Sequence, residues 1–181
     1  MRTTTPSLEW IPRALARGFS LLELMVALSV MGMLLGFGVP AFSSISTNSK
    51  IAAESGNLVA ALTLARNEAM KRGMRVSVCA TADAATCAGT ADWSKGWIVF
   101  QDDSGTAGTL DVSDVPLQNW GAPANGVVVA TAATFVSFSR RARGEVAGQF
   151  MVAKKGCSGN QRRQVDVTAA GRIGLIRQSC P

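Results

Sequence analysis

Apolar residues run almost unbroken from Phe19 to Phe42, and a single charged residue, Glu23, interrupts them. At about 1.5 Å per helical residue this stretch can cross a hydrocarbon core of about 30 Å. Arg2, Arg13 and Arg17 precede it, and positive charge beside a first span holds that end in the cytoplasm. We therefore expect a transmembrane helix over 19–42, with the residues before it in the cytoplasm and the chain after it outside. A secretory signal fits poorly, because its apolar region is usually about 7–15 residues long.

The carboxylate of Glu23 is the most informative feature of this segment. A charged side chain inside a bilayer-spanning helix costs on the order of 2.5–3.5 kcal/mol on insertion scales, so it usually has a partner. The nearest candidate is the N-terminal amine of another copy of the chain. This pairing predicts a protein that assembles with its neighbours. A plain signal-anchor with an accidental glutamate is the competing interpretation.

The helix changes character after Phe42. Small and apolar residues recur at alternating spacings of four and three, which predicts one buried stripe on an otherwise polar helix: Ile51, Ser55, Leu58, Leu62, Ala65 and Ala69. Arg72-Gly73 supplies the cation and the glycine typical of a helix C-terminus. We expect an amphipathic half over 43–74, continuous with the apolar half. Gly36, Gly38 and Pro40 predict a helix break between the halves.

Short segments rich in branched and aromatic residues follow Gly73, separated by Gly, Asp, Ser and Pro clusters. They predict strands over 75–80, 97–100, 127–130, 134–138, 149–153, 164–168 and 173–176. The expected fold class is α+β: a long N-terminal helix packed on a small antiparallel β-sheet or sandwich. The β-rich domain is expected over 75–181, which is within the usual domain size.

The four cysteines all lie in this β-rich region, where three pairings are possible. Local pairing of Cys79 with Cys87 and of Cys157 with Cys180 is the economical choice. An oxidising compartment such as the periplasm fits the expected topology. Zinc is disfavoured, because the chain has no histidine and no CxxC motif.

Other chemistry has little support in the sequence. The chain has no His and no Tyr, so the usual triads and His-ligated metals are excluded. No phosphate loop or Gly-x-Ser-x-Gly motif occurs, and we expect no enzyme, no cofactor and no metal. Four aspartates lie in a Gly/Ser/Thr-rich loop without the order of a calcium loop, which predicts a solvated hairpin tip: Asp102, Asp103, Asp111 and Asp114.

The segment Arg17-Gly18-Phe19-Ser20-Leu21-Leu22-Glu23-Leu24, followed by a long apolar helix and Pro40, resembles the prepilin leader of type IV pilins and type II secretion pseudopilins. The resemblance implies a leader over 1–18 that the prepilin peptidase removes after Gly18. It also implies N-methylation of Phe19 and stacking of subunits through the helix. It assigns Glu23 to the terminal amine of a neighbouring pilin. The protein would begin in the inner membrane, with its C-terminal domain periplasmic, and then enter a pilus or pseudopilus.

The second half of the helix carries a narrower resemblance. The chain is similar to the FimT/FimU minor pilins and the related GspH pseudopilin in three successive stretches: Ala65-Arg66-Asn67-Glu68-Ala69, Val76-Ser77-Val78-Cys79 and Gly96-Trp97-Ile98-Val99-Phe100-Gln101-Asp102. The FimT/FimU side is closer, because a Cys follows the first strand. The chain is thus identified as a member of this group.

Charge is unevenly distributed along the β-rich region. Residues 76–139 carry one basic and six acidic side chains, whereas 140–181 carry nine basic and two acidic ones. Such a basic face can bind anions. FimT-type minor pilins are associated with DNA capture through a Gly-Arg-x-Arg stretch. Here Gly171-Arg172-Ile173-Gly174 matches its first two positions, and Arg162, Arg163 and Arg177 are further candidates. Binding of this kind would be non-sequence-specific.

Three functions remain open from the sequence. The first is a FimT/FimU-like minor pilin that helps to start or tip a type IV pilus and binds DNA for natural transformation. The second is a GspH-like pseudopilin of a type II secretion system. The third is a membrane-anchored periplasmic binding domain unrelated to filaments. The basic residues are also compatible with solvated strand faces or subunit contacts.

Overall fold

The computed structural model describes residues 18–103, 105–124 and 126–180, without the side chains of 37–41. The expected leader, apart from Gly18, lies outside the described residues. The chain divides into two compact units, Met1–Pro40 and Ala41–Pro181. Helix α1, Leu21–Arg72, contributes to both units. Each unit is described by itself below.

Helix α1 is continuous, so the break expected at Pro40 does not interrupt it. A proline in a helix removes one backbone donor, and the turns on either side retain their own hydrogen bonds. The helix ends as the sequence predicts: Gly73 has a φ of 69°, and its N–H donates to the carbonyl of Ala69 at 3.0 Å. A glycine in this left-handed conformation is the common helix terminator.

The first unit exposes its apolar side chains. The large hydrophobic side chains between Phe19 and Leu35 are all more than half exposed. No helix in the described part of the chain is long and apolar enough to qualify as a membrane span.

In the second unit the predicted stripe of α1 is confirmed. Its members Ile51, Ser55, Leu58, Leu62, Ala65 and Ala69 are all fully buried. Glu54, which the periodicity places off the stripe, is also buried. Its carboxylate accepts hydrogen bonds from the backbone N–H of Ala124 at 2.8 Å and from Asn57 Nδ2 at 3.1 Å. A buried carboxylate needs such partners, and here they connect α1 to the loop before β4.

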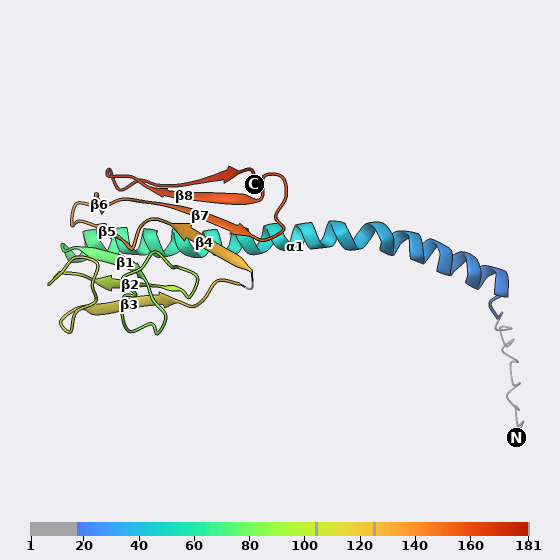
Figure 1. Cartoon of the computed structure of the whole chain (residues 1–181), viewed down its shortest axis with the longest axis horizontal. Coiled ribbons are helices and arrows are strands. Elements are labelled where there is room, and N and C mark those ends of the chain that lie inside the picture. Colours follow the sequence, from blue (N-terminus) through green and yellow to red (C-terminus); the bar gives the residue numbers. More distant parts are fainter. Residues whose placement is uncertain (1–17, 104, 125, 181) are drawn as a thin grey trace, which may run out of the picture. The chain divides into compact units, whose positions relative to one another are not determined.

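The β-rich region forms two antiparallel sheets beside this part of α1 (Figure 1). The five-stranded sheet has the order β3-β2-β1-β5-β6, and the four-stranded sheet has the order β4-β7-β8-β9. The strands are β1 Val76–Ala80, β2 Trp97–Gln101, β3 Val115–Trp120, β4 Val127–Thr131, β5 Phe135–Phe138, β6 Gly144–Val146, β7 Gly148–Lys154, β8 Arg162–Val167 and β9 Ile173–Gln178.

A single cluster of buried side chains joins α1 to both sheets. Trp97 of β2 and Phe150 of β7 lie on either side of Trp93, whose ring meets Phe150 edge-on at a centroid distance of 4.8 Å. The indole N–H of Trp93 donates to the carbonyl of Ala133 at 2.9 Å, which satisfies its one polar group. The expected α+β class is therefore observed, in its two-sheet form.

Two strands were not predicted, and both lie at an edge of the five-stranded sheet. Strand β3 contains Pro116 and polar residues, and its side chains are mostly exposed. Edge strands tolerate a proline because one row of their N–H groups needs no partner. Strand β6 has only three residues, which is too short to show a period. The seven predicted strands are all present, with small shifts of their ends.

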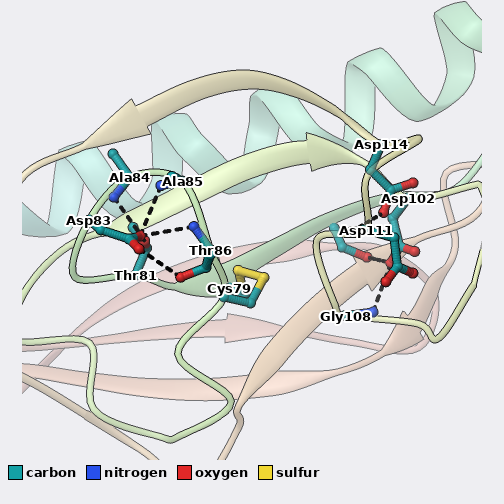
Figure 2. Close-up of a disulfide and its surroundings, with 12 residues drawn as sticks. Cys79, Thr81, Asp83, Ala84, Ala85, Thr86, Asp102, Gly108, Asp111 and Asp114 are labelled. Carbon is teal, nitrogen blue, oxygen red and sulfur yellow. Dashed lines mark hydrogen bonds between the residues drawn. A yellow bond between two sulfur atoms is a disulfide. The ribbon is translucent and has the colours of Figure 1, made fainter.

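Both economical disulfides are present, Cys79–Cys87 and Cys157–Cys180. The first closes a loop in which one oxygen of Asp83 accepts the backbone N–H groups of Ala85 and Thr86, at 2.9 and 2.8 Å (Figure 2). The hydroxyl of Thr86 donates to the other oxygen at 2.8 Å. These donors hold the pKa of Asp83 well below its usual range, because they stabilise the ionised form.

The predicted solvated aspartate loop is wrong for Asp102. This side chain is fully buried, and it accepts hydrogen bonds from Arg75 Nη2 at 2.9 Å and from the hydroxyl of Ser77. It also accepts the backbone N–H of Gly108 at 2.9 Å (Figure 2). The partner of the buried Asp102 is Arg75. The two residues are far apart in sequence, but the pairing of β1 with β2 brings them together. No group of acidic, His or Cys side chains in the described residues is arranged to hold a metal ion.

We expect the Asp83 carboxyl to titrate well below the ordinary aspartate value of about 3.9. Because the folded pKa is the lower one, its contribution to stability is complete above about pH 4 and is lost as the pH falls through the folded pKa. Carboxyl ¹³C NMR titration measures this. Thr86→Val removes one donor, so it should move the Asp83 pKa upward. A normal midpoint in the parent chain would contradict the loop geometry.

Candidate functional site: the N-terminal motif and the basic hairpin

The N-terminal motif has its own local geometry. Gly18, Phe19 and Ser20 precede α1, and the hydroxyl of Ser20 accepts the backbone N–H of Glu23 at 3.1 Å. Ser20-x-x-Glu23 therefore has the spacing of a capping box, and Glu23 lies in the first helical turn. The partial positive charge of a helix N-terminus favours a carboxylate there. This cap was not predicted, although the Ser-x-x-Glu spacing indicates it.

This cap separates the expected scissile bond from the helix. The Gly18–Phe19 peptide has no helical hydrogen bonding, whereas Leu24 N–H already donates to the carbonyl of Ser20 at 3.1 Å. Gly18, Phe19, Ser20 and Glu23 line an open hollow of about 550 Å³. A bond just before a helix cap is accessible to a protease, since no helix must unwind to expose it.

The candidate basic residues lie on the β8–β9 hairpin, where strand pairing divides them into two groups. Arg163 pairs with Arg177, and Arg162 pairs with Gln178, at the open end of the hairpin. Gly171 and Arg172 lie at its turn. Five residues separate Arg172 from Arg177, or about 16 Å at 3.3 Å per strand residue. The predicted basic residues of the hairpin therefore form two separate sites rather than one.

Arg163 differs from the other candidates because it is buried, at 4% exposure. Its Nη2 donates to Asn48 Oδ1 at 2.9 Å, and its Nη1 donates to the carbonyl of Gln161 at 2.8 Å and to that of Asn160 at 3.1 Å. Burial lowers its pKa, and the nearby charge of Arg177 lowers it further. Arg163 thus fastens β8 to α1 and is not presented to a ligand.

A second contact supports this attachment. Gln161 Nε2 donates to the hydroxyl of Ser44 at 2.8 Å, close to where Arg163 meets Asn48. The Cys157–Cys180 disulfide closes the same end of the hairpin. The open end is therefore fixed to the first turns of the second unit's helix, and the hairpin turn lies toward the other end of that helix.

Two turns of the same form meet at that other end. Ser139 N–H donates to the carbonyl of Arg143 at 2.9 Å, and Thr168 N–H donates to the carbonyl of Arg172 at 3.0 Å. The fourth residue of each turn has a positive φ, 58° at Ala142 and 75° at Gly171. We call these segments, 139–143 and 168–172, the paired turns. Each ends in an arginine.

The paired turns are in backbone contact. A Cβ atom on Gly171 would lie 1.8 Å from the carbonyl oxygen of Ala142, and one on Gly144 would lie 2.5 Å from that of Thr168. Only glycine fits at such separations. Gly171 was predicted as part of a binding motif, and the structure gives it this packing role. The contact brings Arg140, Arg141 and Arg143 to the end of the domain that carries Arg172, which sequence separation concealed.

A long helix with a capped apolar start and a buried stripe beneath two antiparallel sheets defines the pilin-like class of proteins. The prokaryotic N-terminal methylation motif matches residues 13–39, and the family model of the type II transport protein GspH matches residues 54–171. The chain belongs to the GspH family, and it is a type IV pilin-like minor pilin or pseudopilin.

Solved structures with a similar fold include the type IV minor pilin FimU of Pseudomonas aeruginosa PAO1, at 22% identity in two crystal forms. The TM-scores are 0.56 and 0.53, and the alignments cover 74% and 72% of this chain and 96% and 99% of FimU. The minor pseudopilin EpsH of the Vibrio cholerae Type 2 Secretion System aligns at a TM-score of 0.49 with 15% identity, over 71% of this chain and 97% of EpsH. Comparison with curated proteins gives no match.

We predict that Arg163→Ala destabilises the domain by about 1.5–3 kcal/mol, the usual range for hydrogen bonds of a charged group. The matched control is Arg177→Ala, its exposed cross-strand neighbour. Removing Arg177 relieves repulsion on Arg163, so this variant should unfold at the same denaturant concentration as the parent or a higher one. Urea unfolding of the disulfide-intact full chain in detergent provides the measurement. Equal urea midpoints for the two variants would exclude the anchoring role of Arg163.

Proposed function

We propose that this protein is a minor pilin of the FimT/FimU type, which enters a type IV pilus and helps to initiate its assembly or to form its tip. The observation that carries the proposal is the succession of a methylation motif and a GspH-family domain on one helix. The fold similarity to FimU supports the pilus side. A GspH-like pseudopilin of a type II secretion system is the alternative, because the family model carries that description.

The proposed assembly step begins with removal of residues 1–18 by the prepilin peptidase and methylation of the new Phe19 amine. The precursor is held in the inner membrane by 19–42, with its C-terminal domain in the periplasm. Supporting this, the large apolar side chains from Phe19 to Leu35 are exposed among the described residues. In the filament, the Glu23 carboxylate pairs with the terminal amine of a neighbouring pilin. Such a pair is much stronger in an apolar environment than in water.

We expect Glu23→Ala to reduce incorporation into sheared filaments at least about tenfold, since losing a pair of about 1.4 kcal/mol changes an equilibrium by that factor. Ser29→Ala, in the same helical segment, is the control and should incorporate normally. Quantitative mass spectrometry measures incorporation. It also reports whether the mature chain begins at methylated Phe19 and contains both disulfides. Normal incorporation of Glu23→Ala, or retention of the eighteen leading residues, would contradict the proposal.

The pilus and secretion alternatives differ in phenotype. Deletion of the gene should abolish pilus-dependent twitching and leave type II secretion intact if the pilin proposal is right. The reverse result favours the pseudopilin. A chain that is never processed would instead favour a membrane-anchored binding domain unrelated to filaments.

The same minor pilin is proposed to bind DNA for natural transformation through its basic C-terminal hairpin. Arg172 and Arg177 are exposed, Arg162 is partly exposed, and no ion pair engages any of them among the described residues. Contacts from such side chains reach phosphates rather than base edges, so binding is non-sequence-specific and weakens as salt rises. Arg163 is not part of this set, because its guanidinium is already engaged in the anchoring contacts described above.

Replacing Arg172 and Arg177 together by alanine should weaken retention of DNA by the full chain in detergent. Each lost phosphate contact lowers the slope of log affinity against log salt by about 0.7–0.9. The control is Lys50→Ala with Lys95→Ala, which removes the same charge away from the hairpin. Gel shifts over a salt series give both quantities. An unchanged shift at low salt would count against DNA binding at this hairpin while leaving the pilin proposal standing.

A further inference from the structure

An open cleft of about 640 Å³ lies beside the paired turns, next to the end of α1. Four arginines line it: Arg75 at the start of β1, and Arg140, Arg141 and Arg143 on the first of the paired turns. Two carboxylates, Asp103 and Glu145, also line the cleft. The three arginines of the turn therefore outnumber the two carboxylates in a space large enough to admit a ligand group.

The four arginines are not equivalent. Arg75 is already bound to the buried Asp102 at 2.9 Å, and this hydrogen bond raises the pKa of its guanidinium. Asp102 in turn holds the start of β1 through Ser77. Arg75 therefore forms a fixed wall of the cleft, with its charge largely neutralised by its partner.

The three arginines of the turn have no such partner. Within the described residues, no ion pair or hydrogen bond engages the guanidinium group of Arg140, Arg141 or Arg143, although the backbone of Arg143 is bound to the Ser139 hydroxyl. Both Arg140 and Arg141 are exposed, as is Arg143. Three like charges within four residues repel one another, and an anion would relieve that repulsion. The turn thus has an unmet preference for negative charge.

The backbone beneath these arginines is held in place. The turn is closed by hydrogen bonds between Ser139 and Arg143 and between Ala142 and Ser139, and it lies against Gly171. Ala142 has a φ of 58°, which an L-residue adopts only where its surroundings impose it. A ligand that binds here does not have to order the backbone first, so the entropic cost of binding is smaller.

We propose that the paired turns form a phosphate-binding site in which Arg140, Arg141 and Arg143 grip successive phosphodiester groups of a nucleic acid strand. The planar guanidinium fork matches phosphate oxygens in a bidentate manner. Arg172, on the second turn, extends the basic surface beyond the cleft. This inference rests on the DNA binding proposed above and centres it at the end of the domain that carries Arg172, away from Arg162 and Arg177 at the open end of the β8–β9 hairpin.

Within the second unit, the cleft lies at the end of the helix opposite to the one that continues into the first unit. The cleft is lined by Gly73 and Met74, just after the last helical residue of the second unit, whereas Ala41 begins that unit at the other end of the same helix. At about 1.5 Å per residue the two ends of this helical part lie more than about 45 Å apart. The chain joins its apolar unit only at the Ala41 end.

The test compares Arg140→Gln/Arg141→Gln/Arg143→Gln with Lys95→Gln/Lys154→Gln/Lys155→Gln, which removes three charges elsewhere. Fluorescence anisotropy of a labelled 20-nucleotide single strand is followed with the full chain in detergent. The arginine variant should bind at least tenfold more weakly, and its salt slope should fall by about 2–3 units, or about 0.7–0.9 per lost phosphate contact. The lysine variant should change much less.

A second variant tests geometry at constant charge. Gly171→Ala places a Cβ against the Ala142 carbonyl and forces the paired turns apart, so it should weaken binding although every arginine remains. Circular dichroism confirms that the variant is folded. If Gly171→Ala does not fold, Ala170→Gly shows whether the turn tolerates substitution, because it leaves the contact between Gly171 and Ala142 intact. The arginine variant then decides the test.

Four outcomes overturn the inference. Equal weakening by the lysine variant would mean that net charge alone governs binding. Normal binding by the arginine variant together with weak binding by Arg172→Ala/Arg177→Ala would return the site to the hairpin face, with DNA binding intact. Binding of heparin but not DNA to the turn would identify a sulfated polysaccharide as the ligand. Failure of the parent chain to bind DNA would overturn both this inference and the DNA part of the proposed function, leaving the pilin assignment untouched.

Discussion

Burial of one narrow face of α1 is the constraint on which the rest of the second unit depends. Its buried residues are small or aliphatic and recur every three or four positions, so they form one continuous apolar stripe. These side chains belong to one buried cluster together with side chains from both sheets. Loss of a large member such as Leu58 or Leu62 would therefore affect both sheets at once.

The two sheets are joined to the helix at opposite ends by polar contacts rather than by more apolar area. Arg163 and Gln161 reach Asn48 and Ser44 near the start of the second unit. At the other end of the helix, Arg72 Nη1 donates to Gln101 Oε1 of β2 at 3.2 Å. Buried polar groups contribute directional bonds, and leaving one unmatched is costly. These contacts fix which strand residue faces which helix residue, a specificity that an apolar stripe does not provide alone.

Sequence reasoning succeeded where the determinants are local. The helix C-terminus, the buried stripe, seven strands and both disulfides follow from periodicity, capping residues and short spacings. It failed at Pro40, which does not interrupt the helix, and where the determinant is a distant partner. The burial of Asp102 depends on Arg75 across a strand pair, that of Arg163 on Asn48, and the meeting of Arg140 with the Arg172 turn on two glycines. A basic run in sequence does not reveal which of its members face inward.

The distribution of charge over the hairpin has a physical logic that separates support from binding. An arginine can be buried only where backbone carbonyls and a side-chain acceptor replace water, and the open end of the hairpin supplies such acceptors to Arg163. In the paired turns, the first and last carbonyls of each turn accept the N–H groups that close it, and the two backbones press against each other. The arginines of these turns are exposed. The same fold thus makes one group of cations structural and leaves the other group able to bind an anion.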